Sequence, residues 1–277
     1  ERKIFRAWCI WLCNPALTQW QENKRKEQFQ SVAREMEAQL LMEEGPWLDP
    51  SINSSDNSIP GTCDVIFIPY LERMNASLAY YKGLNLRQEH PVIHLWFKSL
   101  EELEVYRGTQ GDMHTHAHDL PPQMGGCWIN SNTKQKQFSA AINYGKGLGE
   151  VEMSFANEEE SKDRQSESIA LTRVLKHRKN LMNINPLGSS LFDQPLRAAL
   201  TLMMKGQPCA PQEGSAIGLR YLKDRISVPR DMPLLSARKF RQALEETAQT
   251  DSSQQGPALD TKNRFDQDPK PFCKEVL

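Results

Sequence analysis

The chain has 277 residues, of which 39% are hydrophobic and 25% are charged, and its formal net charge is −1 at pH 7. These values are ordinary for a globular protein, and the length allows one large or two small hydrophobic cores. The near-neutral charge excludes a general attraction to nucleic acid or anionic membrane, and no apolar run approaches the ~20 residues of a membrane-spanning helix.

The first two predicted elements are helices. In Glu1–Cys13 apolar side chains recur at the i, i+3, i+4, i+7 spacing of a helix, and in Lys24–Glu44 they form one face opposite charged residues. Gly45-Pro46 follows the second segment, which is typical of a helix end. Since the chain begins inside a helical pattern, with neither an initiator methionine nor a signal peptide, we expect further sequence upstream of Glu1.

Gly61–Gly83 carries the strongest helical pattern in the chain. Its apolar stripe consists of Phe67, Leu71, Met74, Leu78 and Tyr81. The segment contains Pro69, whose missing N–H costs roughly 3 kcal/mol in a helix interior when nothing compensates for it. His90–Tyr106 is predicted to be the next helix, because Pro91 stands in its first turn and apolar residues follow at helical spacing.

Residues 108–130 contain the unusual sequence HTHAHDLPPQMGGCW. Its LPPQMGG part is too rich in proline and glycine for a regular element. We therefore predict an extended strap that packs back over the helical domain and is anchored by Trp128. Residues 131–165 are mostly polar and are predicted to form a linker.

Helical patterns resume after Gln165 and end near Ala248. The apolar positions of the four predicted helices include Leu171 and Val174, Leu196 and Met203, Leu219 and Leu222, and the segment Leu235–Ala248. Residues 166–249 are therefore predicted to form a second helical region, and residues 250–277 a disordered tail. No strand-rich block is found, so the predicted class is all-α.

Three motifs within residues 1–107 resemble, in their order, the C-terminal helical domain of soluble glutathione S-transferases. They are GPWL at Gly45–Leu48, DVIFIPYLER at Asp64–Arg73 and WFKSLEELEVYR at Trp96–Arg107. In that family a buried central helix opens with a Ser/Thr-x-x-Asp capping box and often has a proline in its second turn. The remainder of the chain resembles an extension found on such proteins in plastid-bearing algae and plants.

The resemblance implies a helical bundle that supplies a hydrophobic-substrate wall and part of a homodimer interface. The catalytic residue and the glutathione site of that family lie in a thioredoxin-like domain, and the βαβ pattern of such a domain is not found in these 277 residues. We therefore expect no catalytic residue and no cofactor in this chain. Glutathione is expected only where an upstream thioredoxin-like domain exists.

Asp64 is the candidate folding residue of the central helix. At the third helical position its carboxylate reaches the amide groups of the first turn, and its charge suits the positive helix end. Gly61 stands where the family has Ser or Thr and supplies no side-chain acceptor. Thr62 is therefore the alternative cap, after a shift of one residue.

Five residues lie on helices that would line the substrate cleft implied by the resemblance. They are Trp8, Trp11, Tyr70, Arg73 and Tyr81. Core packing is the competing interpretation for each aromatic residue, and we favour it. For Arg73 we favour an ion pair with Glu72 or Asp64 over a ligand contact.

His114, His116 and His118 are the candidate metal ligands. On an extended segment all three point the same way, about 7 Å apart at successive steps, so one ion can join neighbours only where the backbone bends. We favour a structural role, in which the histidines bond to backbone and carboxylate groups, and expect no metal.

The six cysteines include no CxxC pair, which favours a reducing compartment over a secreted disulfide framework. We therefore expect an intracellular protein, in cytoplasm or plastid. Cys63 lies in the first turn of its predicted helix and is the one thiol worth testing for reactivity.

Arg220–Arg241 contains seven Lys or Arg residues against two Asp but few aromatics. This pattern favours a solvated face or an acidic protein partner over nucleic acid. Two functions stay open. The first is the helical domain of a glutathione S-transferase-like enzyme. The second is a non-catalytic scaffold that binds partners through residues 108–130 and 166–249.

Overall fold

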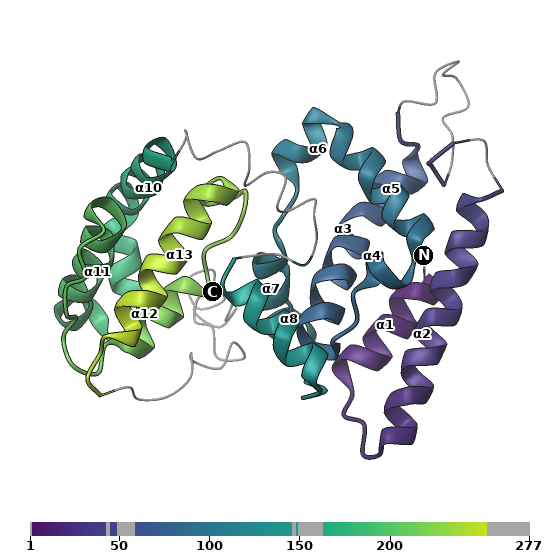
Figure 1. Cartoon of the computed structure of the whole chain (residues 1–277), viewed down its shortest axis with the longest axis horizontal. Coiled ribbons are helices and arrows are strands. Elements are labelled where there is room, and N and C mark those ends of the chain that lie inside the picture. The colour runs from purple at the N-terminus through teal and green to yellow at the C-terminus, as the bar shows by residue number, and fades with distance from the viewer. Residues whose placement is uncertain (1, 43–44, 49–58, 146–147, 149–162, 254–277) are drawn as a thin grey trace, which may run out of the picture. The chain divides into compact units, whose positions relative to one another are not determined.

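The computed structural model describes residues 2–42, 45–48, 59–145, 148 and 163–253. Every regular element in these ranges is a helix, which confirms the all-α class (Figure 1). None of the described helices is long and apolar enough to cross a membrane. Most of the predicted tail and much of the predicted linker, at 254–277 and 149–162, fall outside the described residues.

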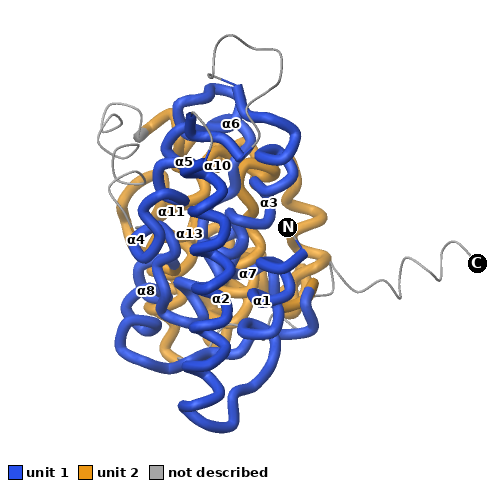
Figure 2. Tube along the Cα trace, turned by 90° about the vertical axis from the view of Figure 1, so that its right-hand side faces the viewer, with its two compact units in different colours: residues 1–120, 124–142 blue, residues 121–123, 143–277 orange. Residues whose placement is uncertain are grey.

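The chain divides into two compact units, which Figure 2 colours separately. Unit 1 comprises residues 1–120 and 124–142, and unit 2 comprises residues 121–123 and 143–277. The elements that lie wholly or mainly in unit 1 are α1 (Arg2–Cys13), α2 (Gln19–Leu40), α3 (Thr62–Ser77), η1 (Leu78–Lys82), α4 (Leu86–Glu89), α5 (Pro91–Glu102), α6 (Glu104–Thr109), α7 (Met113–Met124) and α8 (Thr133–Asn143).

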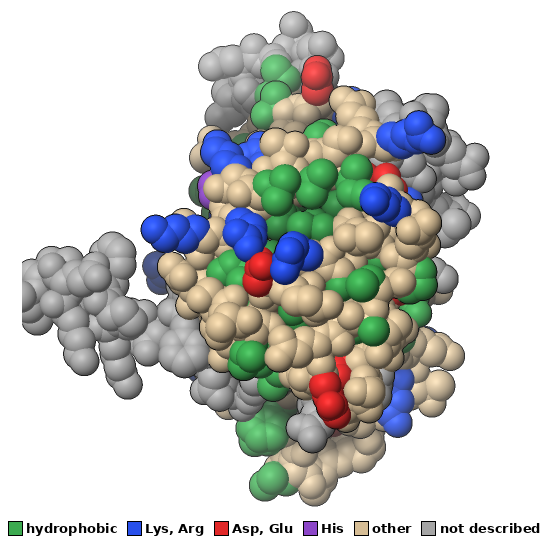
Figure 3. Space-filling view, turned by 90° about the vertical axis from the view of Figure 1, so that its left-hand side faces the viewer, with side chains coloured by type: hydrophobic (Ala, Val, Ile, Leu, Met, Phe, Trp, Pro, Cys, Tyr) green, Lys and Arg blue, Asp and Glu red, His purple; other side chains and the backbone are tan. Residues whose placement is uncertain are grey.

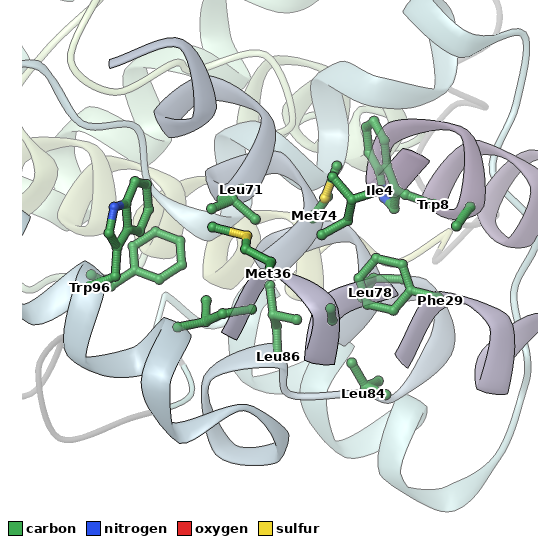
Figure 4. Close-up of a cluster of buried hydrophobic side chains, with 14 of the residues drawn as sticks. Ile4, Trp8, Phe29, Met36, Leu71, Met74, Leu78, Leu84, Leu86 and Trp96 are labelled. Atoms are coloured by element: carbon green, nitrogen blue, oxygen red, sulfur yellow. The ribbon is translucent and has the colours of Figure 1, made fainter. Parts of the chain in front are cut away.

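The core of unit 1 forms where α1, α2, α3 and α5 meet. Its largest fully buried side chains include four tryptophans and a phenylalanine, namely Trp8, Trp11, Trp47, Trp96 and Phe29. Figure 4 shows part of this cluster, with Met36, Leu71 and Met74 lying between Trp96 and Trp8. Burying side chains of this size, at about 2–3 kcal/mol each, holds the helices of unit 1 together.

Two predicted helices are interrupted in the structure. The stripe of Gly61–Gly83 is one α-helix only as far as Ser77, and its last turn, η1, is a π-helix. The segment His90–Tyr106 breaks at Leu103, whose backbone is extended, so that α5 and α6 are separate helices. Apolar spacing is similar in α- and π-turns, so periodicity alone does not mark η1, and the apolar Leu103 continues the stripe of α5 across the second break.

The predicted strap is wrong, because residues 113–124 form the helix α7. Asp112 caps its first turn by accepting a hydrogen bond from the Thr115 N–H at 3.0 Å, and Gly125 ends it in the left-handed conformation. Pro121 deprives the Ala117 carbonyl of its usual helical donor. The Tyr81 hydroxyl replaces it, since it donates to the Ala117 oxygen at 2.8 Å. A tertiary hydrogen bond thus makes the proline tolerable.

The predicted linker is also wrong in part. Residues 133–143 form α8, which Asn132 caps by accepting from the Gln135 N–H at 2.7 Å. An Asn-capped helix of 11 residues with few apolar side chains gives little periodic signal, and the hydrogen bond from the Gln135 side chain to the Tyr80 carbonyl fixes it on unit 1.

Unit 2 contains α10 (Asp163–Ile184), α11 (Gly188–Lys205), α12 (Ala216–Lys223) and α13 (Leu234–Gln249). These match the four predicted helices in order. The prediction of a solvated basic face is wrong, because Lys223, Arg225 and Arg241 are buried. Arg241 donates to the Ile226 carbonyl at 2.5 Å, and Lys223 pairs with Glu245 of α13 at 2.7 Å.

Asp251 caps α12 from outside that helix. Its carboxylate accepts from the Gly214 N–H at 3.1 Å and the Ala216 N–H at 2.8 Å. Burial by itself would raise the pKa of Asp251, but the hydrogen bonds from Ala216, Ser253 and Gly214 outweigh it and hold the pKa below its ordinary value of 3.8.

We expect Asp251→Asn to destabilise unit 2 by about 1–2 kcal/mol at neutral pH. Because the folded pKa is lowered, the contribution of the carboxylate is fully present above pH 3.8 and disappears as the pH falls through the folded value. Hydrogen exchange of the α12 amides, followed from pH 7 to acid, measures the difference in stability between the unsubstituted protein and Asp251→Asn. A difference that grows on acidification would contradict the assignment.

Candidate functional site

The structure places the five predicted cleft residues in different surroundings. Trp8 is buried and donates to the Ser77 hydroxyl at 3.0 Å, and Tyr81 is buried against α7. Tyr70 is half-buried and stacks edge-on against Phe5, with ring centroids 5.5 Å apart. Trp8 and Tyr81 thus pack in the interior of unit 1, as the competing interpretation of core packing expects.

Arg73 does not make the predicted ion pair. Among the described residues it donates one hydrogen bond, to the Pro69 carbonyl one turn earlier at 2.7 Å. Asp64 lies in the first turn of the same helix, more than two turns from Arg73, and Glu72 faces His116, with 3.6 Å between Oε2 and Nε2. An arginine can lie along its own helix and bond to a carbonyl there, which sequence spacing does not reveal.

The three histidines are separated by the helical geometry of α7. His114 and His118 lie one turn apart on one face with ring centroids 4.2 Å apart, and both are buried. His116 lies on another face beside Glu72, where a Cβ on Gly111 would come within 2.5 Å of its ring. The expectation that all three point the same way is wrong, because it assumed an extended segment.

A buried tyrosine completes the surroundings of Glu72. Tyr106 of α6 is buried, and that burial together with the nearby Glu72 carboxylate raises its pKa far above the ordinary range. The tyrosine is therefore neutral at every physiological pH and serves as a hydrogen-bonding group.

The cysteines of α1 are chemically quiet. Burial, followed by the neighbouring Cys13, raises the pKa of Cys9 to about 11, and burial also raises that of Cys13. Both thiols therefore stay protonated at neutral pH, in agreement with packing roles. Cys63 is exposed on the first turn of α3.

Asp64 joins three segments of unit 1 through one carboxylate. The carboxylate is fully buried and accepts from the Gly61 N–H at 3.1 Å, the Leu48 N–H at 2.8 Å and the Trp96 indole N–H at 2.7 Å. The first bond caps α3, whereas the other two come from a preceding loop and from α5. Thr62 is the first residue of α3, so the alternative cap at Thr62 is wrong.

The end of η1 forms a polar pocket of about 380 Å³ within unit 1. Its walls come from α1, α2, the η1–α4 turn and the start of α8. The residues are Trp11, Gln19, Glu22, Asn23, Lys26, Lys82, Gly83, Leu84, Glu89, Asn130, Asn132, Thr133 and Lys134. Of the predicted cleft residues, Trp11 is the one that lines it.

A buried ion pair forms the inner wall of this pocket. The Lys82 and Glu22 side chains are 2% and 9% exposed, and Lys82 Nζ lies 3.5 Å from Glu22 Oε2. The Trp11 indole donates to Glu22 Oε1 at 2.7 Å, and its ring lies 5.9 Å from Lys82 Nζ. Burial lowers the pKa of Lys82, and the Glu22 carboxylate opposes that shift.

The position of Lys82 is set by the π-helical turn η1, which follows α3. Carbonyl oxygens at the end of η1 accept from the α8 segment: Tyr80 from Gln135 at 2.7 Å, Tyr81 from the Asn130 N–H at 2.8 Å and Lys82 from Asn132 at 3.3 Å. These hydrogen bonds fix the backbone from Tyr80 to Lys82 against the segment that leads into α8. π-turns are frequent at functional sites, and no feature of the sequence marked this one.

Gly83 lets the two segments meet. Its φ of +71° is left-handed, and a Cβ there would lie 2.6 Å from the Gln135 backbone nitrogen. We expect Gly83→Ala to destabilise unit 1 by about 3 kcal/mol, since strain and overlap add. Gly125→Ala is the matched control, because Gly125 has a φ of +75° with open space around it, and it should cost about 1 kcal/mol. Equal losses in urea unfolding would contradict the close approach.

Comparison with known proteins gives no match. No protein-family model, no curated protein and no solved structure matches this chain.

Proposed function

We propose that unit 1 is the helical, ligand-binding domain of a protein that resembles the soluble glutathione S-transferases. The full protein would conjugate glutathione to an electrophile, with the thiol chemistry supplied by a thioredoxin-like domain outside these 277 residues. In this proposal unit 1 contributes the electrophile wall and a homodimer contact.

One observation carries the proposal. The three motifs on which the resemblance depends converge on a single carboxylate: Asp64 opens the central helix, Leu48 ends the GPWL motif and Trp96 begins the third motif. Because one buried carboxylate joins the three motifs, they form one structural unit. Their combined occurrence supports a fold shared with that family more strongly than three unconnected similarities would.

The test uses the protein isolated from its natural source. We expect an intact mass well above 31.7 kDa, retention on immobilised glutathione and glutathione-dependent conjugation of an aryl halide. Sedimentation of the same preparation tests the homodimer. An isolated protein that neither binds glutathione nor conjugates an electrophile would contradict the proposal.

The exposed surface of α10 and α11 favours a second candidate function, a scaffold that binds a protein partner. Apolar side chains lie among Lys and Arg on this face (Figure 3), and the exposed large apolar residues of the two helices are Leu175, Ile184, Leu191 and Met204. An acidic partner with an apolar centre fits such a surface.

Substitution on this surface tests the scaffold function. A partner that copurifies with the natural protein should be lost in Leu175→Asp and retained in Leu95→Asp, a variant at an equally exposed leucine of unit 1. Equal retention by both variants would contradict a scaffold function for α10 and α11.

A further inference from the structure

We propose that the pocket at the end of η1 binds a small oxyanion, the carboxylate or phosphate group of a small molecule, through the ammonium group of Lys82. This site is independent of the proposed conjugation chemistry. It requires neither glutathione nor a second domain.

Lys82 has donor capacity beyond its ion pair with Glu22. An ammonium group has three N–H donors. Among the described residues its one ion-pair partner is Glu22, at the long distance of 3.5 Å, and the Trp11 ring lies at 5.9 Å. A charge that is 98% removed from solvent is expensive unless it is well bonded, so an additional acceptor in the pocket would stabilise it.

The charged residues that line the pocket also favour an anion. Three lysines, Lys26, Lys82 and Lys134, stand against two glutamates, Glu22 and Glu89. The Glu22 carboxylate is already engaged by Trp11 at 2.7 Å and by Lys82. The balance of the remaining groups is positive, which favours an anionic ligand.

The N-terminal end of α8 lies at the same pocket. Its first two residues, Thr133 and Lys134, line the pocket, and the cap uses Asn132 on the Gln135 N–H. The first amides of a helix have no partner within it, and the helix dipole favours negative charge there. This feature adds to the buried lysine and would not be sufficient without it.

The size of the pocket limits the ligand. A volume of about 380 Å³ lies at the low end of small-molecule sites, which span roughly 300–1,000 Å³. The polar lining, with Trp11 as its aromatic member, suits a compact metabolite with an acidic group better than a long apolar chain.

The experiment follows the indole N–H resonance of Trp11, assigned with Trp11→Phe, in the full 277-residue chain. This N–H donates to the carboxylate that pairs with Lys82, so it reports on the site directly. The probes are inorganic phosphate, acetate and benzoate, each at constant ionic strength maintained with sodium chloride, because screening alone also shifts resonances.

We expect a saturable shift that sodium chloride does not produce. Saturation with phosphate alone would identify a phosphate ligand, and saturation with acetate or benzoate alone would identify a carboxylate ligand. The double variant Glu22→Leu/Lys82→Met removes both buried charges and should weaken binding by roughly tenfold or more, because charge-assisted hydrogen bonds are lost.

The control is Lys98→Met, which removes an exposed lysine of α5 outside the pocket and should leave binding unchanged. If the double variant does not fold, Lys26→Met/Lys134→Met serves instead, and binding should weaken severalfold. No saturable shift with any probe, or a shift that persists in the pocket variants, would overturn the proposal.

Discussion

Replacing Asp64 with alanine is expected to lower the free energy of unfolding of unit 1 by about 4 kcal/mol. The substitution leaves three donors, Gly61 N–H, Leu48 N–H and the Trp96 indole, without their acceptor in the interior. All six tryptophans of the chain lie in unit 1, so urea unfolding followed by tryptophan fluorescence reports on this unit alone.

Thr18→Ala is the matched control for Asp64→Ala. Thr18 caps α2 at an exposed position by accepting from the Gln21 N–H at 3.2 Å, and its loss should cost about 1 kcal/mol. The loss of unfolding free energy in Asp64→Asn should lie between those of the two variants, because an amide keeps one acceptor oxygen. A loss in Asp64→Ala no larger than in Thr18→Ala would mean that the carboxylate acts only as a helix cap.

Glu22→Leu is expected to lower the free energy of unfolding of unit 1 by about 4 kcal/mol, because it leaves the Lys82 ammonium buried without its carboxylate. The double variant Glu22→Leu/Lys82→Met removes both charges but leaves the Trp11 indole N–H without its acceptor, so its free energy of unfolding should lie about 1–3 kcal/mol below that of the unsubstituted protein. Urea unfolding of the four proteins in this cycle measures the coupling between the two residues.

The pH dependence of this cycle has a definite sign. Burial lowers the folded pKa of Lys82 below 10.5, so the unfolded chain binds more protons between the two values and stability rises with pH there. Without Glu22 the folded pKa of Lys82 falls further. The loss of unfolding free energy caused by Glu22→Leu should therefore become smaller as the pH is raised. A deficit that is constant from pH 6 to 9 would indicate lost packing and not a buried charge.

Much of the fold could be predicted from the sequence because most helices have an apolar stripe. The helical patterns of unit 2 and the position of Asp64 as an acceptor for the first turn of α3 follow from spacing alone. The two further donors of Asp64 do not, because they come from segments 16 and 32 residues away. Local sequence specifies a cap, and only the packed helices specify the network.

The pocket could not be predicted for a related reason. Lys82 ends an apolar stripe and is typical of a solvent-facing residue before a glycine, and Glu22 stands in a polar stretch of α2. Their pairing depends on the π-turn and on α8, neither of which has a periodic signal. The strap prediction is wrong because the Tyr81 hydroxyl, from outside α7, replaces the donor that Pro121 lacks, and no local pattern reveals such a partner.

The hydrogen bond from Tyr81 to the Ala117 carbonyl has an evolutionary consequence. Without Pro121 that carbonyl would have a donor in its own helix, and the tyrosine hydroxyl would be dispensable. With Pro121 the hydroxyl becomes necessary, so Tyr81→Phe should be costly here and nearly neutral in a Pro121→Ala background. A lineage that gained the tyrosine first would have met no barrier, whereas one that gained the proline first would have passed through a less stable ancestor.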